Sequence, residues 1–557
     1  MKRYLPVLEW LPRYDRGWLR GDLLAGATVW AVLIPSALAY AGIVGVDAVV
    51  GLYTVPLALA AYAVFGGSRL LVVGPDAAIS VMAAATVASV VTDDPQLDLV
   101  VALALISGGV YLAFAVLRMG WIADLIPDPV IKGFIEGLVW VTILGQVPKL
   151  LGVRIEGEGF FDEVIEAVGA LSDAHAETAI VGVGCLASLL LLRRFAPRLP
   201  GPLIVLVAAI VVVGGLGLAD EGVAVVGETS GALDGIRLPT GLGVDTLLAL
   251  VPGAIAISVL GFTESLGAAK RAAESTGERI NPDQELLALG MANLGAGVSG
   301  GYVVTGALSK TAVAIDADGK TQVANLFAGA LGLLTLLFLL PLFENLADAA
   351  LAAIVIVAMS GLSDLGYFRS LWSIRRLEFL VAIAAFVGVL VVGVLAGVIV
   401  GVLLALVILA DHIGKPPTAV LGRTADGSFV DQSVDTTAEN IPGMLIWRQD
   451  APLVFLNARR LSDALRELTE ERGDLQVVVI DCSAMSDIDT TATTAFAAVG
   501  RDLRGQGIAV WVTAIRQRNW ERVVAALGGP AITPPPRFVS NEAAVAEFAR
   551  RQGDRTE

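Results

Sequence analysis

The sequence predicts a polytopic α-helical membrane protein with a C-terminal cytoplasmic α/β domain. Of its 557 residues, 56% are hydrophobic and 17% are charged, and 61 are glycine. A water-soluble domain cannot use so much apolar sequence, because its surface must be largely polar. Apolar runs fill residues 21–413, whereas the sequence after Lys415 has the mixed composition of a soluble domain. We therefore expect an N-terminal cytoplasmic segment over 1–20, a membrane domain over 21–413, a linker over 414–442 and a soluble domain over 443–557.

The composition also excludes several classes of function. The two cysteines, Cys185 and Cys482, lie in regions of different character and do not predict a disulfide framework. Two histidines, His175 and His412, are too few for a histidine metal site. No nucleophile–base pair is evident, so we expect no metal, no cofactor and no enzymatic activity. The formal net charge of −16 argues against nucleic acid as a partner.

Fourteen apolar segments between residues 21 and 413 are candidate membrane spans. A helix needs about 20 apolar residues to cross about 30 Å of hydrocarbon, and short polar joints separate the segments. They lie near residues 22–43, 47–65, 75–92, 97–117, 127–147, 177–194, 201–218, 247–269, 283–299, 308–317, 322–341, 348–362, 378–393 and 395–411.

Basic residues alternate along the predicted loops in agreement with this number of spans. If the N-terminus is cytoplasmic, the loops on its side contain residues such as Arg69, Arg118, Arg193, Lys270 and Arg375, whereas the opposite loops are mostly acidic. Cytoplasmic loops carry an excess of lysine and arginine. The pattern predicts a multi-pass membrane protein with both termini in the cytoplasm, and we expect it in the plasma membrane.

Two of the predicted spans, the third and the tenth, are interrupted. The third opens with Gly74-Pro75-Asp76, and the tenth is short and follows the glycine-rich stretch after Gly300. Interrupted spans at matching places in two halves of seven are typical of transporters built on inverted repeats. Two half-helices that meet would direct N–H groups and positive dipole ends at one point, which binds anions. The alternative is that glycine and proline merely kink ordinary helices.

Four ionisable residues lie well inside predicted spans, namely Asp76, Glu136, Glu264 and Lys310. Each costs on the order of 2.5–3.5 kcal/mol at a helix centre, so each marks a candidate functional position. Lys310, beside Ser309, would attract an anion by its charge. Its alternative role is an ion pair with Asp76 or Glu264.

The three carboxylates have different expected roles. Glu264, in the eighth span, could bind a coupling proton or sodium ion, because burial and a nearby cation shift its proton affinity in opposite directions. A static ion pair is the alternative. Asp76 begins the third span, where its other role is to cap free N–H groups. Glu136 is the weakest candidate, because it lies near the inner end of its span and its side chain can reach water.

Two groups of motifs carry a family resemblance. The first group is Gly21-Asp22-Leu23-Leu24-Ala25-Gly26-Ala27-Thr28-Val29, Ile34-Pro35-Ser36 and Ala39-Tyr40-Ala41. The second is Asn281-Pro282-Asp283-Gln284-Glu285-Leu286, the run over 305–313 and Gly319-Lys320-Thr321. Together they resemble the SulP anion permeases (solute carrier family 26), and the resemblance covers essentially the whole chain.

The resemblance implies a seven-plus-seven inverted repeat in which a core domain moves against a gate domain. It implies an anion site between the third and tenth spans, with substrate-binding positions at Ser36, Tyr40, Asp76, Ala77, Ser309 and Lys310, and a coupling-ion position at Glu264. Three positions depart from the family pattern, since Ser36 replaces glutamine, Asp76 an aromatic residue and Lys310 an arginine. Lysine lacks the planar fork of arginine and attracts an oxyanion as a point charge.

The soluble part alternates strands and helices after Gly443. Strands are predicted over 444–448, 453–457, 475–480 and 508–513, and helices over 460–471, from 489, over 519–527 and over 541–551. This pattern is typical of an α/β domain and is similar to STAS domains, which implies a role in dimerisation and regulation. Thr490 and Thr491 lie where related domains carry a phosphorylatable residue at a helix N-terminus. The alternative is that they only cap the helix.

The resemblance implies a secondary active transporter that moves a small anion across the lipid bilayer by alternating access and works as a homodimer. Sulfate is the expected substrate, with bicarbonate and dicarboxylates, or anion exchange, as alternatives. Coupling to H⁺ or Na⁺ is expected, and Gly267-Ala268 favours H⁺ because it lacks the hydroxyl of sodium-coupled relatives. A nucleobase permease of the same fold, a passive anion channel and a membrane-anchored STAS signalling protein remain as rival functions.

Overall fold

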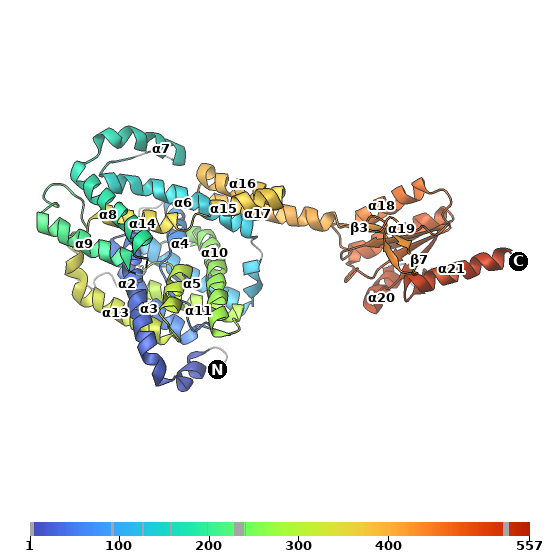
Figure 1. The fold of residues 1–557 in the computed structure, drawn as a ribbon, viewed down its shortest axis with the longest axis horizontal. Coiled ribbons are helices and arrows are strands. Elements are labelled where there is room, and N and C mark those ends of the chain that lie inside the picture. The colour runs from blue at the N-terminus through green and yellow to red at the C-terminus, as the bar shows by residue number, and fades with distance from the viewer. Residues whose placement is uncertain are drawn as a thin grey trace. The chain divides into compact units, whose positions relative to one another are not determined.

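The computed structural model describes residues 5–90, 94–124, 127–155, 157, 159–197, 199–227, 239, 241–526 and 534–556. The chain divides into two compact units, Met1–Ala405 and Leu406–Glu557. The first is built almost entirely of helices, whereas the second contains a sheet (Figure 1). Residues 91–92 of the predicted third span and residue 527 of a predicted helix lie outside the described part.

Each of the fourteen predicted spans coincides with a helix of the described chain. The helices are α2 (Leu19–Val44), α3 (Ala48–Phe65), α4 (Ala77–Ala88), α5 (Gln96–Val116), α6 (Asp128–Leu151), α8 (Ala176–Phe195), α9 (Gly201–Leu216), α10 (Val244–Thr276), α11 (Pro282–Val298), α12 (Leu308–Asp316), α13 (Val323–Leu334), α14 (Asp348–Ser360), α16 (Arg376–Val392) and α17 (Val394–Gly414). A π-helical turn over Thr335–Leu339 and a 3₁₀ turn over Leu340–Phe343 extend α13. Within the described residues, eight helical segments are long and apolar enough to cross a membrane.

The helices of the first unit pack as two groups. In one group, α11 packs against α3 and α5, α13 packs against α2 and α3, and α10 packs against α5. In the other, α14 packs against α6 and α8, and α16 packs against α6. Contacts of α2 with α9 and α14 join the groups. This division agrees with the expected core and gate domains.

Close backbone contact explains one glycine of α3. Gly51 of α3 faces the carbonyl group of Ala37 on α2, and a Cβ atom at this position would overlap it. A second glycine ends α2. Gly45 adopts a φ of 85°, and its N–H donates a hydrogen bond of 3.0 Å to the carbonyl oxygen of Ala41. Gly51 thus allows α2 and α3 to pack closely, and Gly45 ends α2 shortly before α3 begins at Ala48.

Several helical segments escape prediction because they are short or amphipathic rather than uniformly apolar. They are α1 (Val7–Trp10), α7 (Phe160–Gly169), α15 (Leu365–Ile374) and 3₁₀ turns over Leu11–Arg13, Arg16–Trp18, Gly120–Asp124 and Ala170–Asp173. In α7 the apolar side chains of Phe161 and Ile165 are exposed, as in a helix that lies along a membrane surface.

Two motifs of the predicted family signature meet at the start of α13. The carboxylate of Asp22, on α2, is fully buried and accepts hydrogen bonds from the backbone N–H groups of Lys320 and Thr321 at 2.7 and 3.0 Å. It also accepts one from the Thr321 hydroxyl at 2.7 Å. Asp22 therefore satisfies the free N–H groups ahead of a distant helix, which explains how these two motifs work together.

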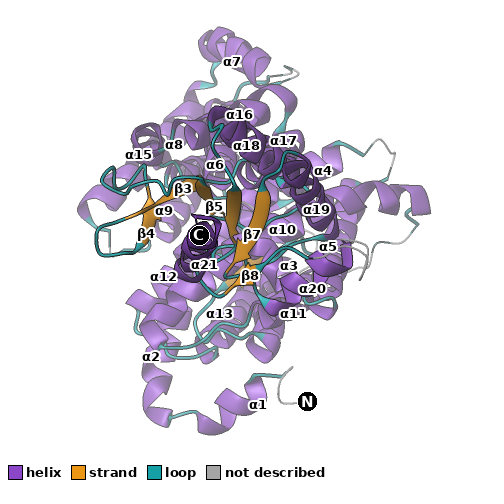
Figure 2. Cartoon of the chain, turned by 90° about the vertical axis from the view of Figure 1, so that its right-hand side faces the viewer, coloured by secondary structure: helices purple, strands orange, loops and turns teal. Residues whose placement is uncertain are grey.

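The second unit contains a six-stranded sheet with the order β4-β3-β5-β6-β7-β8 (Figure 2). The strands are β3 (Thr418–Arg423), β4 (Phe429–Asp431), β5 (Met444–Gln449), β6 (Val477–Asp481), β7 (Ala509–Thr513) and β8 (Arg537–Phe538). The pairs from β5 to β8 are parallel, and β3 pairs antiparallel with β4 and β5. The helices are α18 (Ala458–Glu471), α19 (Thr490–Gly505), α20 (Gln517–Ala526) and α21 (Asn541–Thr556).

The predicted strand over 453–457 is wrong. This stretch is a turn in which the side-chain oxygen of Asn457 accepts a hydrogen bond from the Val454 N–H at 2.8 Å, and Leu453 forms only an isolated bridge with Ile488. The sheet instead gains β3 and β4, which lie within the stretch 414–442 interpreted as a linker.

Candidate functional site

The two interrupted segments meet in a short antiparallel ladder. Strand β1 (Val73–Gly74) precedes α4, strand β2 (Thr305–Gly306) precedes α12, and Val73 pairs with Gly306. Because α4 has 12 residues and α12 has nine, neither segment is an unbroken helix of membrane-spanning length. The kinked-helix alternative is therefore excluded, and the N-termini of both short helices lie next to the ladder.

Buried side chains from α10 and α11 hold the ladder in place. The Ser265 hydroxyl accepts a hydrogen bond from the Gly306 N–H at 2.8 Å and lies 2.7 Å from the Thr305 hydroxyl. The Asn293 amide bonds both the N–H and the carbonyl oxygen of Val304, at 3.0 and 2.9 Å. Irregular backbone inside a membrane protein needs such partners because no water is present to supply them.

Sequence reasoning missed Ser265, Asn293 and Thr305. Each is a fully buried polar residue. The available signal was their position in or beside apolar helices. Ser265 directly follows Glu264, and Asn293 lies within the apolar stretch of α11 that follows Glu285.

Lys310 connects the beginnings of the two short helices. Its side chain is 2% exposed, and its Nζ donates a hydrogen bond of 2.6 Å to the carbonyl oxygen of Pro75, just before α4. The same Nζ lies 5.6 Å from the ring centroid of Tyr40, over the face of the ring. Among the described residues Lys310 forms no ion pair with Asp76 or Glu264.

The two helix starts are capped differently. Asp76 Oδ1 accepts a hydrogen bond of 3.1 Å from the Ala78 N–H, so the carboxylate caps α4, as its alternative role requires. The N-cap residue of α12 is Ala307, whose side chain cannot cap. The free N–H groups at the start of α12 therefore remain for another acceptor, and the positive end of its dipole is not offset by a capping carboxylate.

The other predicted binding residues surround this point unevenly. Tyr40 and Ser36 are buried on α2, at 6% and 7% exposure, and Ala77 is buried at the first position of α4. The Ser36 hydroxyl donates to the Val32 carbonyl oxygen at 2.7 Å, within its own helix. Ser309 is exposed, whereas its neighbour Lys310 is buried. The structure thus brings Tyr40, the start of α4 and Lys310 together and leaves the Ser309 side chain on another face of α12.

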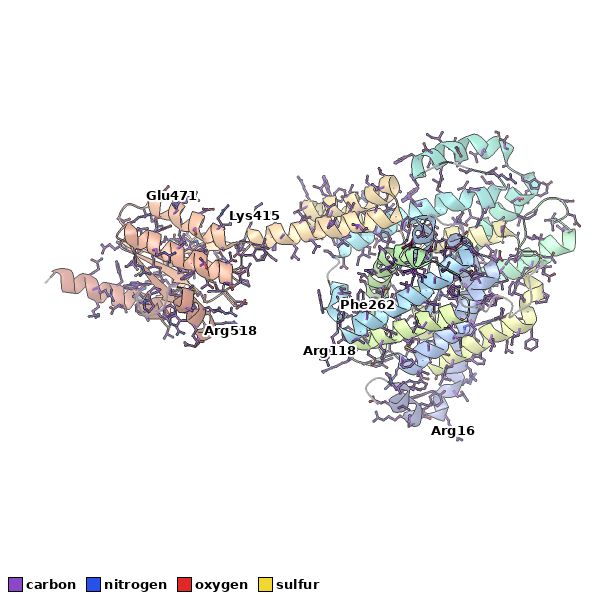
Figure 3. All side chains as sticks on the ribbon, turned by 180° about the vertical axis from the view of Figure 1, so that it is seen from behind. Arg16, Arg118, Phe262, Lys415, Glu471 and Arg518 are labelled. Carbon is purple, nitrogen blue, oxygen red and sulfur yellow. The ribbon has the colours of Figure 1, made fainter. Side chains whose placement is uncertain are left out.

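Glu264 lies in α10, two residues after the fully buried Phe262 labelled in Figure 3. It interacts electrostatically with Asp76, and Asp76 interacts with Lys310 and Tyr40 in the same way. Glu264 makes no ion pair or hydrogen bond with any described residue. Two carboxylates and one ammonium group therefore share one cluster, and the static ion pair considered for Glu264 is absent from the described residues.

Glu136 does not reach water as the sequence suggests. Its side chain is 3% exposed and accepts hydrogen bonds from the Ser363 hydroxyl at 2.9 and 3.0 Å and from the Trp140 indole N–H at 3.1 Å. It also accepts one from the Asp364 N–H at 3.3 Å. Glu136 is buried because α6 packs against α14, and it ties α6 to the loop after α14.

In the second unit, Asp489 rather than Thr490 or Thr491 caps α19. Asp489 Oδ1 accepts a hydrogen bond of 2.7 Å from the Ala492 N–H, and Oδ2 accepts one of 2.6 Å from the Phe455 N–H. Both threonines are exposed at the helix N-terminus. The capping role considered for them is therefore wrong, and their hydroxyls are accessible.

Comparisons with known proteins extend over nearly the whole chain. The sequence profile of the sulfate permease family matches residues 19–385, and that of the STAS domain matches residues 435–526. The chain is 34% identical over 552 residues to a probable sulfate transporter of Mycobacterium tuberculosis. This alignment covers 98% of each protein.

Two solved structures share the fold. The anion transporter SLC26A9 superposes with a TM-score of 0.90 at 21% identity, covering 99% of this chain and 93% of SLC26A9. The transmembrane domain of the cyanobacterial bicarbonate transporter BicA superposes with a TM-score of 0.62 at 24% identity, covering 71% of this chain and 98% of that domain. This protein belongs to the sulfate permease family and carries a C-terminal STAS domain.

Proposed function

We propose that this protein is a secondary active transporter of a small anion, with sulfate as its substrate. The observation that carries the proposal is the arrangement of Lys310 at the β1–β2 crossing, where a buried ammonium group adjoins the uncapped start of α12. A fixed cation and free N–H groups at a helix start together favour an oxyanion. The sulfate-transporter names of relatives at 28–34% identity support sulfate over bicarbonate or a dicarboxylate.

The anion displaces the Pro75 carbonyl oxygen as the acceptor of the Lys310 ammonium group. The α4 start is already occupied by the Asp76 carboxylate, so the α12 start supplies the backbone donors. The Tyr40 ring lies beside the ammonium group and limits the space around it. In this binding mode Ser309 contributes its backbone N–H, because its side chain is exposed.

Charge balance at the cluster supports coupling to protons. An approaching anion meets Asp76, Glu264 and Lys310, whose full charges sum to one negative charge. A proton on Glu264 removes that excess, so proton binding and anion binding favour each other. This linkage makes H⁺ symport the proposed mode, and Glu264 the coupling residue.

The transport cycle follows from the two helix groups. The site lies on α2, α4, α10 and α12, and we propose that this group moves past α6, α8, α9, α14 and α16 to open the site to alternate sides. The protein acts as a homodimer in the plasma membrane with its termini in the cytoplasm. The STAS domain regulates it, with phosphorylation at Thr490 or Thr491 as one means.

Counterflow with purified protein in liposomes tests the proposed function. Labelled sulfate, bicarbonate and succinate are offered separately to vesicles loaded with the same unlabelled anion. Sulfate should accumulate transiently, and at low sulfate concentration Lys310→Ala should strongly reduce this accumulation. Lys132→Ala, a change in an exposed ion pair with Asp364, should preserve it. Counterflow of bicarbonate or succinate, together with no counterflow of sulfate, would show that sulfate is not the substrate. Normal activity of Lys310→Ala with loss of a cellular phenotype on deletion of the STAS domain would favour a signalling protein.

A further inference from the structure

A polar cavity, separate from the proposed transport site, lies between the N-terminal segment and two loops. Its volume is about 210 Å³. Trp10 and Arg13 line it from the N-terminal segment, Arg69 lines it from the loop after α3, and Glu278 and Arg279 line it from the loop after α10. The N-terminal segment is marked in Figure 3 by Arg16.

Within the described part of the chain, two of the three arginines in this cavity have free guanidinium groups. Arg69 Nε lies 2.8 Å from Glu278 Oε1, so this pair is internally neutralised. Arg13 and Arg279 are exposed and form no ion pair or hydrogen bond with any described residue. Glu9 is the other acidic residue of the lining, so the cavity has a net positive charge. Guanidinium groups present several N–H donors in a plane and bind phosphate in a bidentate way.

A buried donor without an acceptor points to the same ligand. The indole Nε1 of Trp10 is buried and has no hydrogen-bond partner among the described residues. An unpaired buried donor destabilises the protein, and Trp10 itself lines the cavity, where an acceptor oxygen would offset this cost. A phosphate oxygen would supply an acceptor for the indole N–H as well as for the guanidinium groups.

The surroundings favour a lipid as the source of the phosphate. Leu8, Leu11 and Leu19 of the same segment are exposed, at 48%, 53% and 44%. Exposed leucines beside arginines are typical of a segment that lies in the membrane interface. The basic loops that contain Arg69 and Arg279 are those predicted to be cytoplasmic, and the cytoplasmic leaflet carries anionic lipids that bind basic pockets.

We propose that this cavity binds the phosphate group of an anionic phospholipid of the inner leaflet. The guanidinium groups of Arg13 and Arg279 hold the phosphate, Trp10 donates to it, and the acyl chains extend along the exposed leucines. The lipid thereby fastens the N-terminal segment to the loops that precede β1 and α11. Free phosphate has the same recognition chemistry, so the experiment separates the two sources.

Native mass spectrometry of the full-length protein, titrated with dioleoyl phosphatidylglycerol, tests the proposal. The test variant is Arg13→Gln/Arg279→Gln. The matched control is Arg271→Gln/Arg369→Gln, which removes two exposed arginines outside the cavity. Each basic residue near a membrane surface contributes about 1 kcal/mol, so the test variant should bind the tightest phosphatidylglycerol about 30-fold more weakly. The control should bind it like the wild type.

Two results would overturn the proposal. One is equal retention of phosphatidylglycerol by the test variant and the control. The other is displacement of the lipid by 10 mM inorganic phosphate in the wild type, which would identify soluble phosphate as the ligand. Equal sulfate counterflow by both variants in phosphatidylcholine vesicles shows that they are folded, because neither pair lies at the transport site.

Discussion

The Nζ of Lys310 donates a 2.6 Å hydrogen bond to the carbonyl oxygen of Pro75, although the two residues belong to opposite halves of the fold. The lysine that begins one short helix thus contacts the backbone that leads into the other. Because the ammonium group is 2% exposed, an anion that binds there must replace this carbonyl group rather than surrounding water. Anion binding and the distance between the two helix starts are therefore linked.

Removing the Lys310 charge should weaken anion binding strongly. A hydrogen bond to a charged group contributes about 1.5–3 kcal/mol, so Lys310→Ala should raise the half-saturating sulfate concentration about 10- to 150-fold. Lys310→Arg keeps the positive charge, so it should raise the half-saturating sulfate concentration by a smaller factor. Concentration series of sulfate counterflow measure this, with Lys132→Ala as the control. A half-saturating concentration unchanged in Lys310→Ala would remove the lysine from the site.

Glu264 should control coupling rather than anion recognition. The glutamine of Glu264→Gln mimics a glutamate that is always protonated. Sulfate binding should therefore persist, whereas uptake driven by an inward pH gradient should disappear. Parallel measurements of gradient-driven uptake and sulfate exchange in proteoliposomes separate these effects. Normal gradient-driven uptake by Glu264→Gln would refute the coupling role.

Asp76 combines a capping role with an unfavourable charge, and two substitutions separate them. Asp76→Asn keeps a capping side chain but removes the negative charge, so the half-saturating sulfate concentration should fall. Asp76→Ala also removes the cap and should destabilise the protein by about 1 kcal/mol. Thermal unfolding together with counterflow measures both properties. Weaker sulfate binding by Asp76→Asn would mean that the carboxylate itself holds the substrate or its coupling proton.

Asn293 should be essential for the structure of the antiparallel ladder of β1 and β2. Asn293→Ala leaves the N–H and the carbonyl group of Val304 without their side-chain partner, at a cost of about 1–3 kcal/mol for each group. The melting temperature should fall and counterflow should decrease with it. Asn345→Ala, at an exposed position, is the control. An equal melting temperature for both variants would contradict this role.

The sequence predicts the positions of the helices far better than it predicts the polar contacts between them. The position of a span depends on the apolar content of one segment, so it can be predicted locally. Gly74-Pro75 and the glycines after Gly300 indicate the two interrupted segments. The amphipathic α7 and α15 escape because their apolar residues are spaced rather than continuous.

Contacts between distant segments depend on three-dimensional packing, which periodicity does not encode. Glu136 illustrates this, since its burial follows from the loop after α14 and not from its own helix. The cap of α19 is a local feature, but three neighbouring residues could supply it, and only the backbone geometry selects Asp489. The partner of Lys310 is a backbone carbonyl group, which no residue pattern reveals.

An anomalous-scattering map of crystals of the full-length protein grown with selenate would show where the anion binds. Selenate has the shape and charge of sulfate, and its selenium atom can be located unambiguously. We expect a selenium peak where β1 pairs with β2, with the anion's oxygens within hydrogen-bond distance of the Lys310 Nζ and the first N–H groups of α12. A selenium peak elsewhere between the two helix groups, with the Lys310–Pro75 hydrogen bond intact, would contradict it.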